Sequence, residues 1–235
     1  MIKQLKNKIH ILQNIYLKNK YFYKRVSYAM DGEDIAILKC VNYIKNGFYV
    51  DIGSHHPVQR SNTCLLYQNG WRGINVDIND FTLDLFNYLR PDDINIQAAI
   101  SDYNGNIDFY YQKDFSQLNT TDLNWAKENF SDNYQTKKIK CQTFNNLLEQ
   151  TKHNNQKIDF LNIDVEGAEM KVLNGLNFNS YDPEVICIEI LGYRHLSNIE
   201  KESAIKTDQI YKFLINKHYK KIWSGQSFCS HIFVK

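Results

Sequence analysis

Acidic side chains stand at or near the end of four short apolar segments of the sequence. These side chains are Asp51, Asp77, Asp164 and Glu189, in the segments 48–52, 73–77, 158–164 and 184–190. Carboxylates accept hydrogen bonds from hydroxyl and ammonium groups, and they can take up a proton during a reaction. The pattern therefore indicates a site that binds a polar molecule or alters it chemically.

The first acidic segment continues as Asp51-Ile52-Gly53-Ser54-His55-His56-Pro57. Gly53 lets the backbone pass close to a ligand. A dinucleotide-binding loop would show G-x-G-x-x-G here, and this loop has one glycine followed by histidines and a proline. A single acid-x-Gly turn suits a cofactor with an amino-acid end. The alternative is an ordinary strand-to-helix turn.

The second and third segments carry residues that suit a nucleoside. Asp77 can accept hydrogen bonds from ribose hydroxyls, and we expect Asp80 rather than Asp77 to cap the helix that begins near Phe81. The small residues of Gln97-Ala98-Ala99 leave space for an adenine ring. Plain packing of these alanines is the alternative.

The stretch Asn162–Glu169 is the most distinctive in the sequence, because three carboxylates crowd the end of a predicted strand and the start of a helix. A helix N-terminus stabilises such charge and keeps the carboxylates ionised. Ionised carboxylates are ready acceptors of hydrogen bonds but weak bases.

These residues must be positioned by an α/β fold. Five apolar runs are read as strands (48–52, 73–77, 94–100, 158–164 and 184–190), with helices between most of them, for example 63–67 and 81–89. Short apolar strands that alternate with helices indicate a parallel sheet covered on both faces, with ligands beyond the carboxyl ends of its strands. Segments 219–223 and 230–234 predict an antiparallel hairpin at the sheet edge. Between about 104 and 143 the alternation breaks. Asn104-Gly105 marks a turn into Asp108–Tyr111, and the polar stretch beyond is expected to be a substrate loop.

The composition of the 235-residue chain narrows its function. A net charge of +2 is too balanced to indicate nucleic-acid binding, although seven basic and no acidic residues lie between Lys3 and Arg25. The five cysteines form no C-x-x-C pair, and the N-terminus lacks the apolar core of a signal peptide. We therefore expect a cytoplasmic protein without a zinc site or a stable membrane insertion. We divide it into an amphipathic helical extension, 1–26, whose helix covers about 2–23, and one domain, 27–235.

Several ordered motifs resemble the FkbM-type methyltransferases. The run 159–169, followed by Val172-Leu173, is similar to their signature, and 47–57 resembles a subgroup with a D-I-G-x-H-H-P loop. Segments 61–63 and 70–77 agree with that subgroup. Ser27-Tyr28 and Gly32-Glu33-Asp34 match its S-[YF]-x-Q-x-G-E-D entry motif, except that Met30 replaces Gln. Ser54 stands where Ala is common. The resemblance covers residues 27–235.

The resemblance implies a class I methyltransferase fold, which is a Rossmann-like, seven-stranded, mostly parallel sheet with an antiparallel last strand, here preceded by N-terminal helices. It implies S-adenosyl-L-methionine as cofactor and S-adenosylhomocysteine as product. The expected reaction is O-methylation of a sugar, with a nucleotide-sugar of surface or capsular polysaccharide synthesis as the favoured small-molecule substrate. The alternatives are a methyltransferase that acts on another small molecule, such as a secondary metabolite, or a non-catalytic module that binds the cofactor. A nucleic-acid methyltransferase is disfavoured by the acidic stretch after the fourth strand, and the oligomeric state is left open, with a homo-oligomer included.

Site residues follow from the motifs and the resemblance together. The catalytic candidates are Asp164, Glu166, Glu189, His55, His56 and His195, with Asp164 ranked first. The cofactor candidates are Glu33, Asp34, Asp51, Gly53, Ser54, Ser61, Asn62, Thr63, Asp77, Ile78, Gln97, Ala98 and Asp164. No metal site is assigned. Mg²⁺ held by Asp164 and Glu189 is a less favoured alternative.

Overall fold

A seven-stranded sheet forms the centre of the molecule in the computed structural model, which describes residues 2–113, 116–131, 133–193 and 196–235. Its strand order is β3-β2-β1-β7-β8-β10-β9. The bounds are β1 Phe48–Ile52, β2 Arg72–Asp77, β3 Ile94–Gln97, β7 Phe160–Ile163, β8 Val185–Glu189, β9 Lys220–Ser224 and β10 Ser230–Val234. In this sheet β10 is antiparallel to both of its neighbours, β8 and β9, and the other described strand pairs are parallel. The expected mostly parallel sheet with an antiparallel last strand is therefore confirmed.

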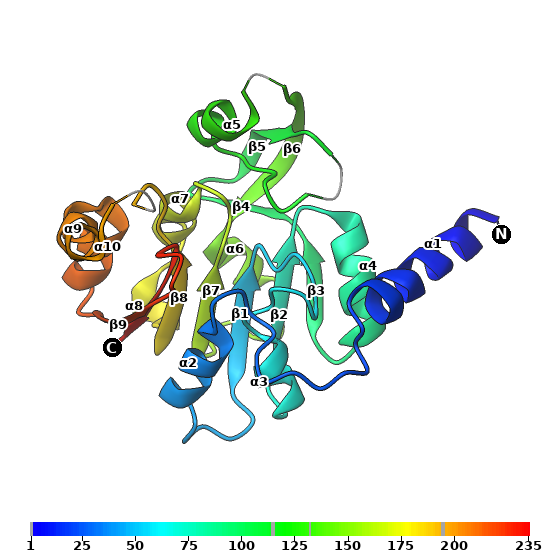
Figure 1. The fold of residues 1–235 in the computed structure, drawn as a ribbon, viewed down its shortest axis with the longest axis horizontal. Helices are drawn as coiled ribbons and strands as arrows, with labels where there is room; N and C mark the ends of the chain where they lie inside the picture. Colours follow the sequence, from blue (N-terminus) through cyan, green and yellow to red (C-terminus); the bar gives the residue numbers. More distant parts are fainter. Residues whose placement is uncertain (1, 114–115, 132, 194–195) are drawn as a thin grey trace.

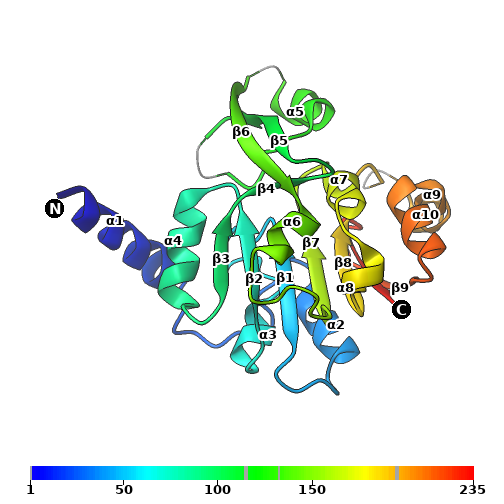
Figure 2. The same ribbon diagram turned by 180° about the vertical axis from the view of Figure 1, so that it is seen from behind.

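Helices lie on both faces of the large sheet (Figures 1 and 2). Tyr49 of β1 packs with α2 (Glu33–Cys40) and α3 (Cys64–Gln68) on one face. Val50 and Ile52 pack on the other face, against the layer that holds α6 (Phe144–Glu149), α7 (Glu169–Asn174), α8 (Phe178–Tyr181) and α10 (Gln209–Asn216). This strand is buried on both faces, which is why it is a continuous apolar run.

The predicted strand 94–100 is wrong as a single strand. β3 ends at Gln97, and β4 (Ala99–Ser101) joins a second sheet. The break is at Ala98, whose backbone N–H donates to the carbonyl of Asp77 at 3.0 Å. A continuous apolar run could not reveal this, because most residues of both halves are buried or half-buried.

The predicted polar loop beyond residue 111 is also wrong, since much of this stretch is regular structure. β4, β5 (Gly105–Tyr111) and β6 (Gln135–Thr143) form a three-stranded sheet, and α5 (Leu123–Phe130) packs Trp125 and Phe130 near Tyr110. Strand β6 is mostly exposed and rich in lysine, so it lacks the apolar signal of a strand. This cap, defined as residues 99–143, lies above the large sheet in Figure 1.

The N-terminal helix is shorter than predicted. α1 (Ile2–Leu12) continues as a π-helix, Gln13–Lys18, and ends there rather than near residue 23. Its Ile11 and Ile15 pack on Leu85 of α4 (Asp80–Leu89).

The C-terminal hairpin forms as expected, although β10 lies between β8 and β9 and only β9 is at the sheet edge. Two helical segments, α9 (Asn198–Ala204) and the short 3₁₀ turn Ile205–Thr207, precede α10. Among the described residues, no helix has both the length and the apolar character needed to cross a bilayer.

Candidate functional site

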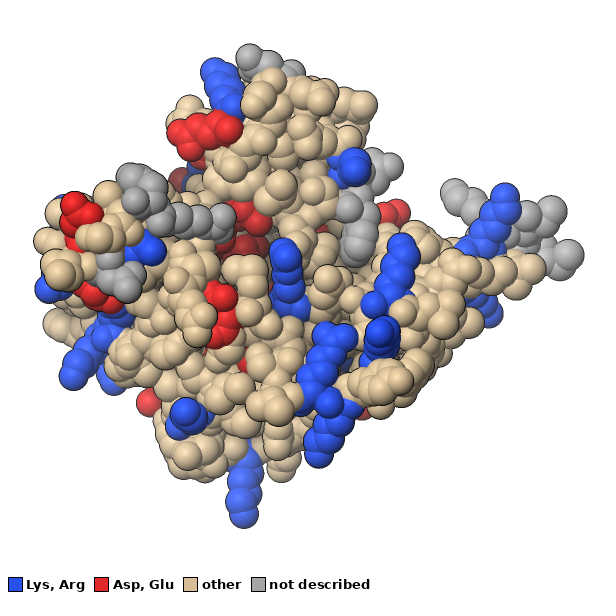
Figure 3. Space-filling model, viewed as in Figure 1, with Lys and Arg blue, Asp and Glu red and all other residues tan. Residues whose placement is uncertain are grey.

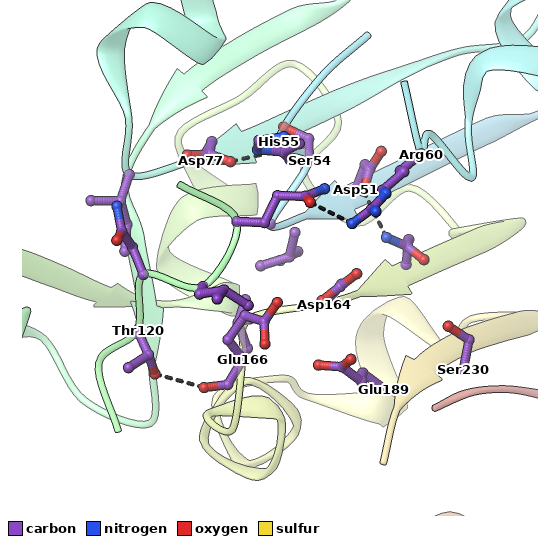
Figure 4. Close-up of a pocket in the computed structure, with 18 of the residues that line it drawn as sticks. Asp51, Ser54, His55, Arg60, Asp77, Thr120, Asp164, Glu166, Glu189 and Ser230 are labelled. Carbon is purple, nitrogen blue, oxygen red and sulfur yellow. Dashed lines mark hydrogen bonds between the residues drawn. The ribbon is translucent and has the colours of Figure 1, made fainter. Parts of the chain in front are cut away.

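A cavity of about 950 Å³ opens at the carboxyl ends of β1, β2, β7 and β8 and is roofed by the cap (Figure 4). In Figure 3, acidic side chains gather in a hollow between the cap and the body of the molecule. Thirteen of the predicted site residues line this cavity. They are Glu33, Asp51, Gly53, Ser54, His55, Ser61, Asn62, Asp77, Ile78, Ala98, Asp164, Glu166 and Glu189. The cavity lies where the chain turns from one half of the sheet to the other, as expected for a ligand site in this kind of fold.

Gly53 is required by the packing of two backbones. Its φ is +81°, and a Cβ placed on it would lie 1.7 Å from the carbonyl oxygen of Asp164. The backbone N–H groups of Gly53 and Ser54 both donate to the carbonyl of Val76. The loop after β1 is therefore clamped between the ends of β7 and β2, and the glycine serves this clamp as well as any approach to a ligand.

Asp51 is buried beside the cavity and accepts two short hydrogen bonds. Thr63 Oγ1 donates to Oδ2, and Asn162 Nδ2 donates to Oδ1, each at 2.8 Å. Burial raises the pKa of the Asp51 carboxyl. Asn62 extends the network by donating to Asn162 Oδ1 at 2.9 Å. Thr63 itself lies outside the cavity lining formed by the described residues, so its contact with the site runs through Asp51.

Arg90 holds the loop after β1 in place, and no sequence pattern points to it. The residue is 1% exposed, and its guanidinium donates to Thr63 Oγ1 at 2.8 Å, to Ser61 Oγ at 3.0 Å and to the carbonyl of Pro57. Arg90 closes α4, where an arginine is ordinarily exposed. Its role has no local signal, because its partners lie 27 to 33 residues away in the sequence.

Asp77 faces the cavity from the end of β2. Its carboxylate accepts the backbone N–H of His55 at 2.9 Å and that of Asn79 at 2.8 Å. Burial raises the Asp77 pKa to about 6. The expected cap at Asp80 is wrong, since Asn79 occupies the N-cap of α4 and Asp80 is the first residue of the helix.

The cofactor candidates at the ends of β2 and β3 divide into two groups. Ile78 and Ala98 line the cavity, together with Ala99. Gln97 lies outside the lining formed by the described residues, and its side chain donates to the carbonyl of Ile78 at 2.9 Å. Gln97 therefore supports the wall of the cavity from behind.

His56 does not occupy a catalytic position. The residue is 1% exposed and is absent from the lining that the described residues form. Its Nδ1 accepts the backbone N–H groups of Val58 and Gln59 at 2.9 Å each, so the proton sits on Nε2, which points at Asn14 Oδ1, 2.8 Å away. Burial lowers the His56 pKa to about 3. His56 as a general base is therefore corrected to a structural residue.

Of the other two histidine candidates, His55 and His195, the structure describes only His55. His55 does line the cavity, with φ at +46°. Burial, with a smaller contribution from Arg60, lowers its pKa to about 4, which makes the ring a weak base. His195 lies outside the described residues.

The entry motif contributes Glu33 and Met30 to the cavity lining and Asp34 to the structure around it. Glu33 is buried, lines the cavity and accepts the backbone N–H of Asp31 at 2.7 Å. Asp34 lies outside the described lining, and its carboxylate instead accepts Ser27 Oγ and the N–H of Tyr28, both at 2.6 Å. Asp34 as a direct cofactor contact is thus corrected to a residue that fixes the segment before α2. Met30, which departs from the family motif, lines the cavity.

Three acidic residues come together after β7 and β8. One carboxylate oxygen each from Asp164, Glu166 and Glu189 lies within 4.8 Å of the other two. Glu189 is 8% exposed, and burial, followed by the charges of Asp164 and Glu166, raises its pKa well above the ordinary value. Glu169 stands behind the cluster, and burial raises its pKa to about 7 while Oε1 accepts the N–H groups of Val165 and Gly167.

The cap is fastened to both sides of the cavity. Thr120 Oγ1 donates to the carbonyl of Glu166 at 2.6 Å, beyond the end of β7. Arg60 Nη1 donates to Gln117 Oε1 at 2.6 Å, beyond the end of β1. The roof of the cavity is therefore held at two points, and amide and hydroxyl side chains of the cap line it.

Solved structures and a family model match this chain. The O-methyltransferase from Bacillus cereus, solved in complex with SAH, is 12% identical, with a TM-score of 0.44, over 96% of this chain and 91% of that chain. Trm1 from Pyrococcus horikoshii, in complex with S-adenosyl-L-methionine, is 9% identical, with a TM-score of 0.45, over 90% of this chain and 57% of that chain. No curated protein matches the sequence significantly. The family model described as the methyltransferase FkbM domain matches residues 51–220, and the chain therefore belongs to the FkbM family of methyltransferases.

Proposed function

We propose that the chain is an S-adenosylmethionine-dependent O-methyltransferase whose acceptor is a sugar hydroxyl, carried on a nucleotide-sugar for surface or capsular polysaccharide synthesis. The observation that carries the methyl transfer is the group of acidic residues around one cavity in a chain of the FkbM family. The sugar is supported by the roof, where Gln117, Asn119 and Asn129 offer amides that pair with hydroxyl groups. The free state of all five cysteines favours a reducing, cytoplasmic setting.

The residues present fit the cofactor. Asp77 offers carboxylate oxygens where ribose hydroxyls would lie, and Ala98 beside it leaves room for a flat ring. Asp51 and Glu33 place negative charge at the end of β1, where an ammonium group would be held. When bound, S-adenosylmethionine supplies a methyl group on a positively charged sulfur, which is already activated for transfer.

The protein then has to orient the acceptor, exclude water and accept one proton. The cap, fastened through Thr120 and Gln117, covers the cavity and limits water. We assign to Asp164 the role of accepting the proton from the acceptor hydroxyl. This residue lies beside the Gly53 turn and lines the cavity. Proton acceptance by a positioned group contributes about 10²–10⁴-fold to such rates. The acceptor oxygen forms the new bond to the methyl carbon as the bond from that carbon to sulfur breaks.

The cofactor assignment is tested by thermal unfolding. S-adenosylhomocysteine at about 100 times its dissociation constant should stabilise the protein by about 2.7 kcal/mol, whereas NAD should not. D77N should weaken this binding by about tenfold to a hundredfold, from the loss of one charged hydrogen-bond acceptor. D80N is the matched control, because Asp80 lies at the start of α4 and outside the described lining. Stabilisation by NAD alone would contradict the assignment.

The reaction is tested by mass spectrometry of nucleotide-sugars incubated with enzyme and S-adenosylmethionine. One sugar should gain a CH₂ increment, and D164N should slow its formation. Methylation of a phenol or peptide with all sugars unchanged would replace the proposed acceptor class. Cofactor binding with no methylation of any acceptor would favour a non-catalytic binding module.

A further inference from the structure

Asp164, Glu166 and Glu189 form a compact acidic cluster, and each of them lines the cavity (Figure 4). β7 and β8 are paired neighbours in which Ile163 is opposite Ile188. Asp164 and Glu189, the next residue along the chain in each case, therefore lie at matching positions on the same edge of the sheet. Glu166 is brought back toward them by its left-handed backbone, with φ at +54°.

One oxygen of this cluster has no partner in the described part of the chain. Glu189 is 8% exposed, and its Oε2 is buried without any hydrogen bond among the described residues. A buried carboxylate oxygen left unpaired is expensive, and native proteins ordinarily supply a partner, an ion or water. Three carboxylates this close also repel one another. The cluster thus needs a positive charge or protons to neutralise it.

The spacing suits a hard cation. Opposite ligands on Ca²⁺, at about 2.3–2.6 Å each, are about 4.6–5.2 Å apart, and those on Mg²⁺ are about 4.0–4.2 Å apart. The oxygens of the cluster lie within 4.8 Å of one another. At most one pair of them can be opposite on a shared ion, so the three carboxylates would draw closer together around Ca²⁺, and further around the smaller Mg²⁺ or Mn²⁺. All three donors are carboxylate oxygens, which are typical ligands of these ions and not of softer metals.

We propose that Asp164, Glu166 and Glu189 together bind one hard divalent cation, of the class of Mg²⁺, Mn²⁺ and Ca²⁺, on the floor of the cavity. Three protein ligands leave coordination positions open toward the cavity. An acceptor with two adjacent hydroxyl groups would fill those open positions, and this role of the cation rests on the proposed function. A bound cation also acidifies a hydroxyl group, which eases its deprotonation.

The test is calorimetric titration of the protein with Mn²⁺, Mg²⁺ and Ca²⁺ in the absence of cofactor and acceptor, with electron paramagnetic resonance of bound Mn²⁺ as a second readout. Wild type should bind one ion. E189Q keeps the size of the side chain and should weaken binding by more than about tenfold, since even changes around the ligands of a metal cost about 10–100-fold. E128Q is the control, because Glu128 lines the same cavity from α5 and lies outside the cluster.

Stabilisation by S-adenosylhomocysteine, measured on the same samples, separates this inference from the proposed function. Normal stabilisation with no Mn²⁺ bound at millimolar concentration would overturn the cation site and leave protons as the neutralising charge. Equal Mn²⁺ binding by E189Q and wild type would overturn it too. Mn²⁺ binding lost in E189Q and kept in E128Q supports the site, even if the proposed cofactor fails to bind.

Discussion

Nε2 of His56 lies 2.8 Å from Oδ1 of Asn14, so the N-terminal π-helix is hydrogen-bonded to the loop that follows β1. Both residues are buried, and Asn19 Nδ2 also donates to Asn14 Oδ1 at 2.9 Å. The sequence predicts segment 1–26 as an extension separate from the domain. This contact joins the helical part of that segment to the wall of the cavity.

Replacement of Asn14 tests whether this joint supports the cavity. N14A leaves the Nε2–H of His56 without its acceptor, and we expect the free energy of unfolding to fall by about 1–3 kcal/mol. Binding of S-adenosylhomocysteine should weaken as well, because the loop is less ordered. N7A is the control, since Asn7 bonds Asp84 at 2.7 Å from the same helix, away from the loop. Equal effects of the two variants on binding would show that the joint has no specific role.

The depressed pKa of His56 predicts a loss of stability in acid. Its folded value is about 3 against 6.5 for the exposed ring. Between these two pH values the unfolded chain binds a proton at His56 that the folded chain does not bind. The contribution of neutral His56 to the free energy of unfolding is therefore complete above pH 6.5 and declines as the pH falls toward 3. The slope is at most about 1.4 kcal/mol per pH unit.

H56N removes this titration, and the fall in unfolding free energy between about pH 6.5 and pH 5 should be smaller than in wild type by about 1–2 kcal/mol. Urea denaturation at the two values measures it. H218N, at an exposed histidine, should follow wild type. A wild-type slope retained in H56N would place the titration elsewhere.

Alanine at Gly53 should be far more damaging than at another left-handed glycine. The added Cβ would meet the Asp164 carbonyl at 1.7 Å, whereas at Gly32, with φ at +87°, it would meet nothing within 4 Å. Both variants bear the left-handed strain of about 1–2 kcal/mol. We expect G53A to lose more than about 4 kcal/mol or fail to fold, measured by thermal or urea unfolding. Similar losses in both would mean that the β7 loop moves aside freely.

Arg90 and Arg72 provide a second matched pair. R90K loses the fork that reaches Thr63, Ser61 and the Pro57 carbonyl, and we expect a loss of about 3–5 kcal/mol, because buried polar groups lose their partners. R72K alters an exposed ion pair with Asp92 and should change stability by about 0–1 kcal/mol. Chemical denaturation compares the two. A tolerated R90K would show that a single ammonium replaces the whole network.

The sequence by itself determined most strands of the large sheet and much of the cavity. Strands buried on both faces are apolar runs, and their carboxyl ends meet at one edge when the strands are parallel. Asp51, Asp77, Asp164 and Glu189 are therefore expected around one site from the sequence alone. The position of each residue along its own strand is sufficient to predict that it lies at this edge, because that position is read from the local sequence.

Only the tertiary structure decided which of the polar residues face the cavity and which hold it together. His56 and Asp34 have the residue types and neighbours of functional groups, yet their partners are Asn14, 42 positions away, and the segment around Ser27. Arg90 shows no local sign of its role, and β6 has the composition of a loop because most of it is exposed. The hydrogen-bond partners of His56 and Arg90 are distant in the sequence and are chosen by packing, so no pattern of neighbouring residues could have specified them.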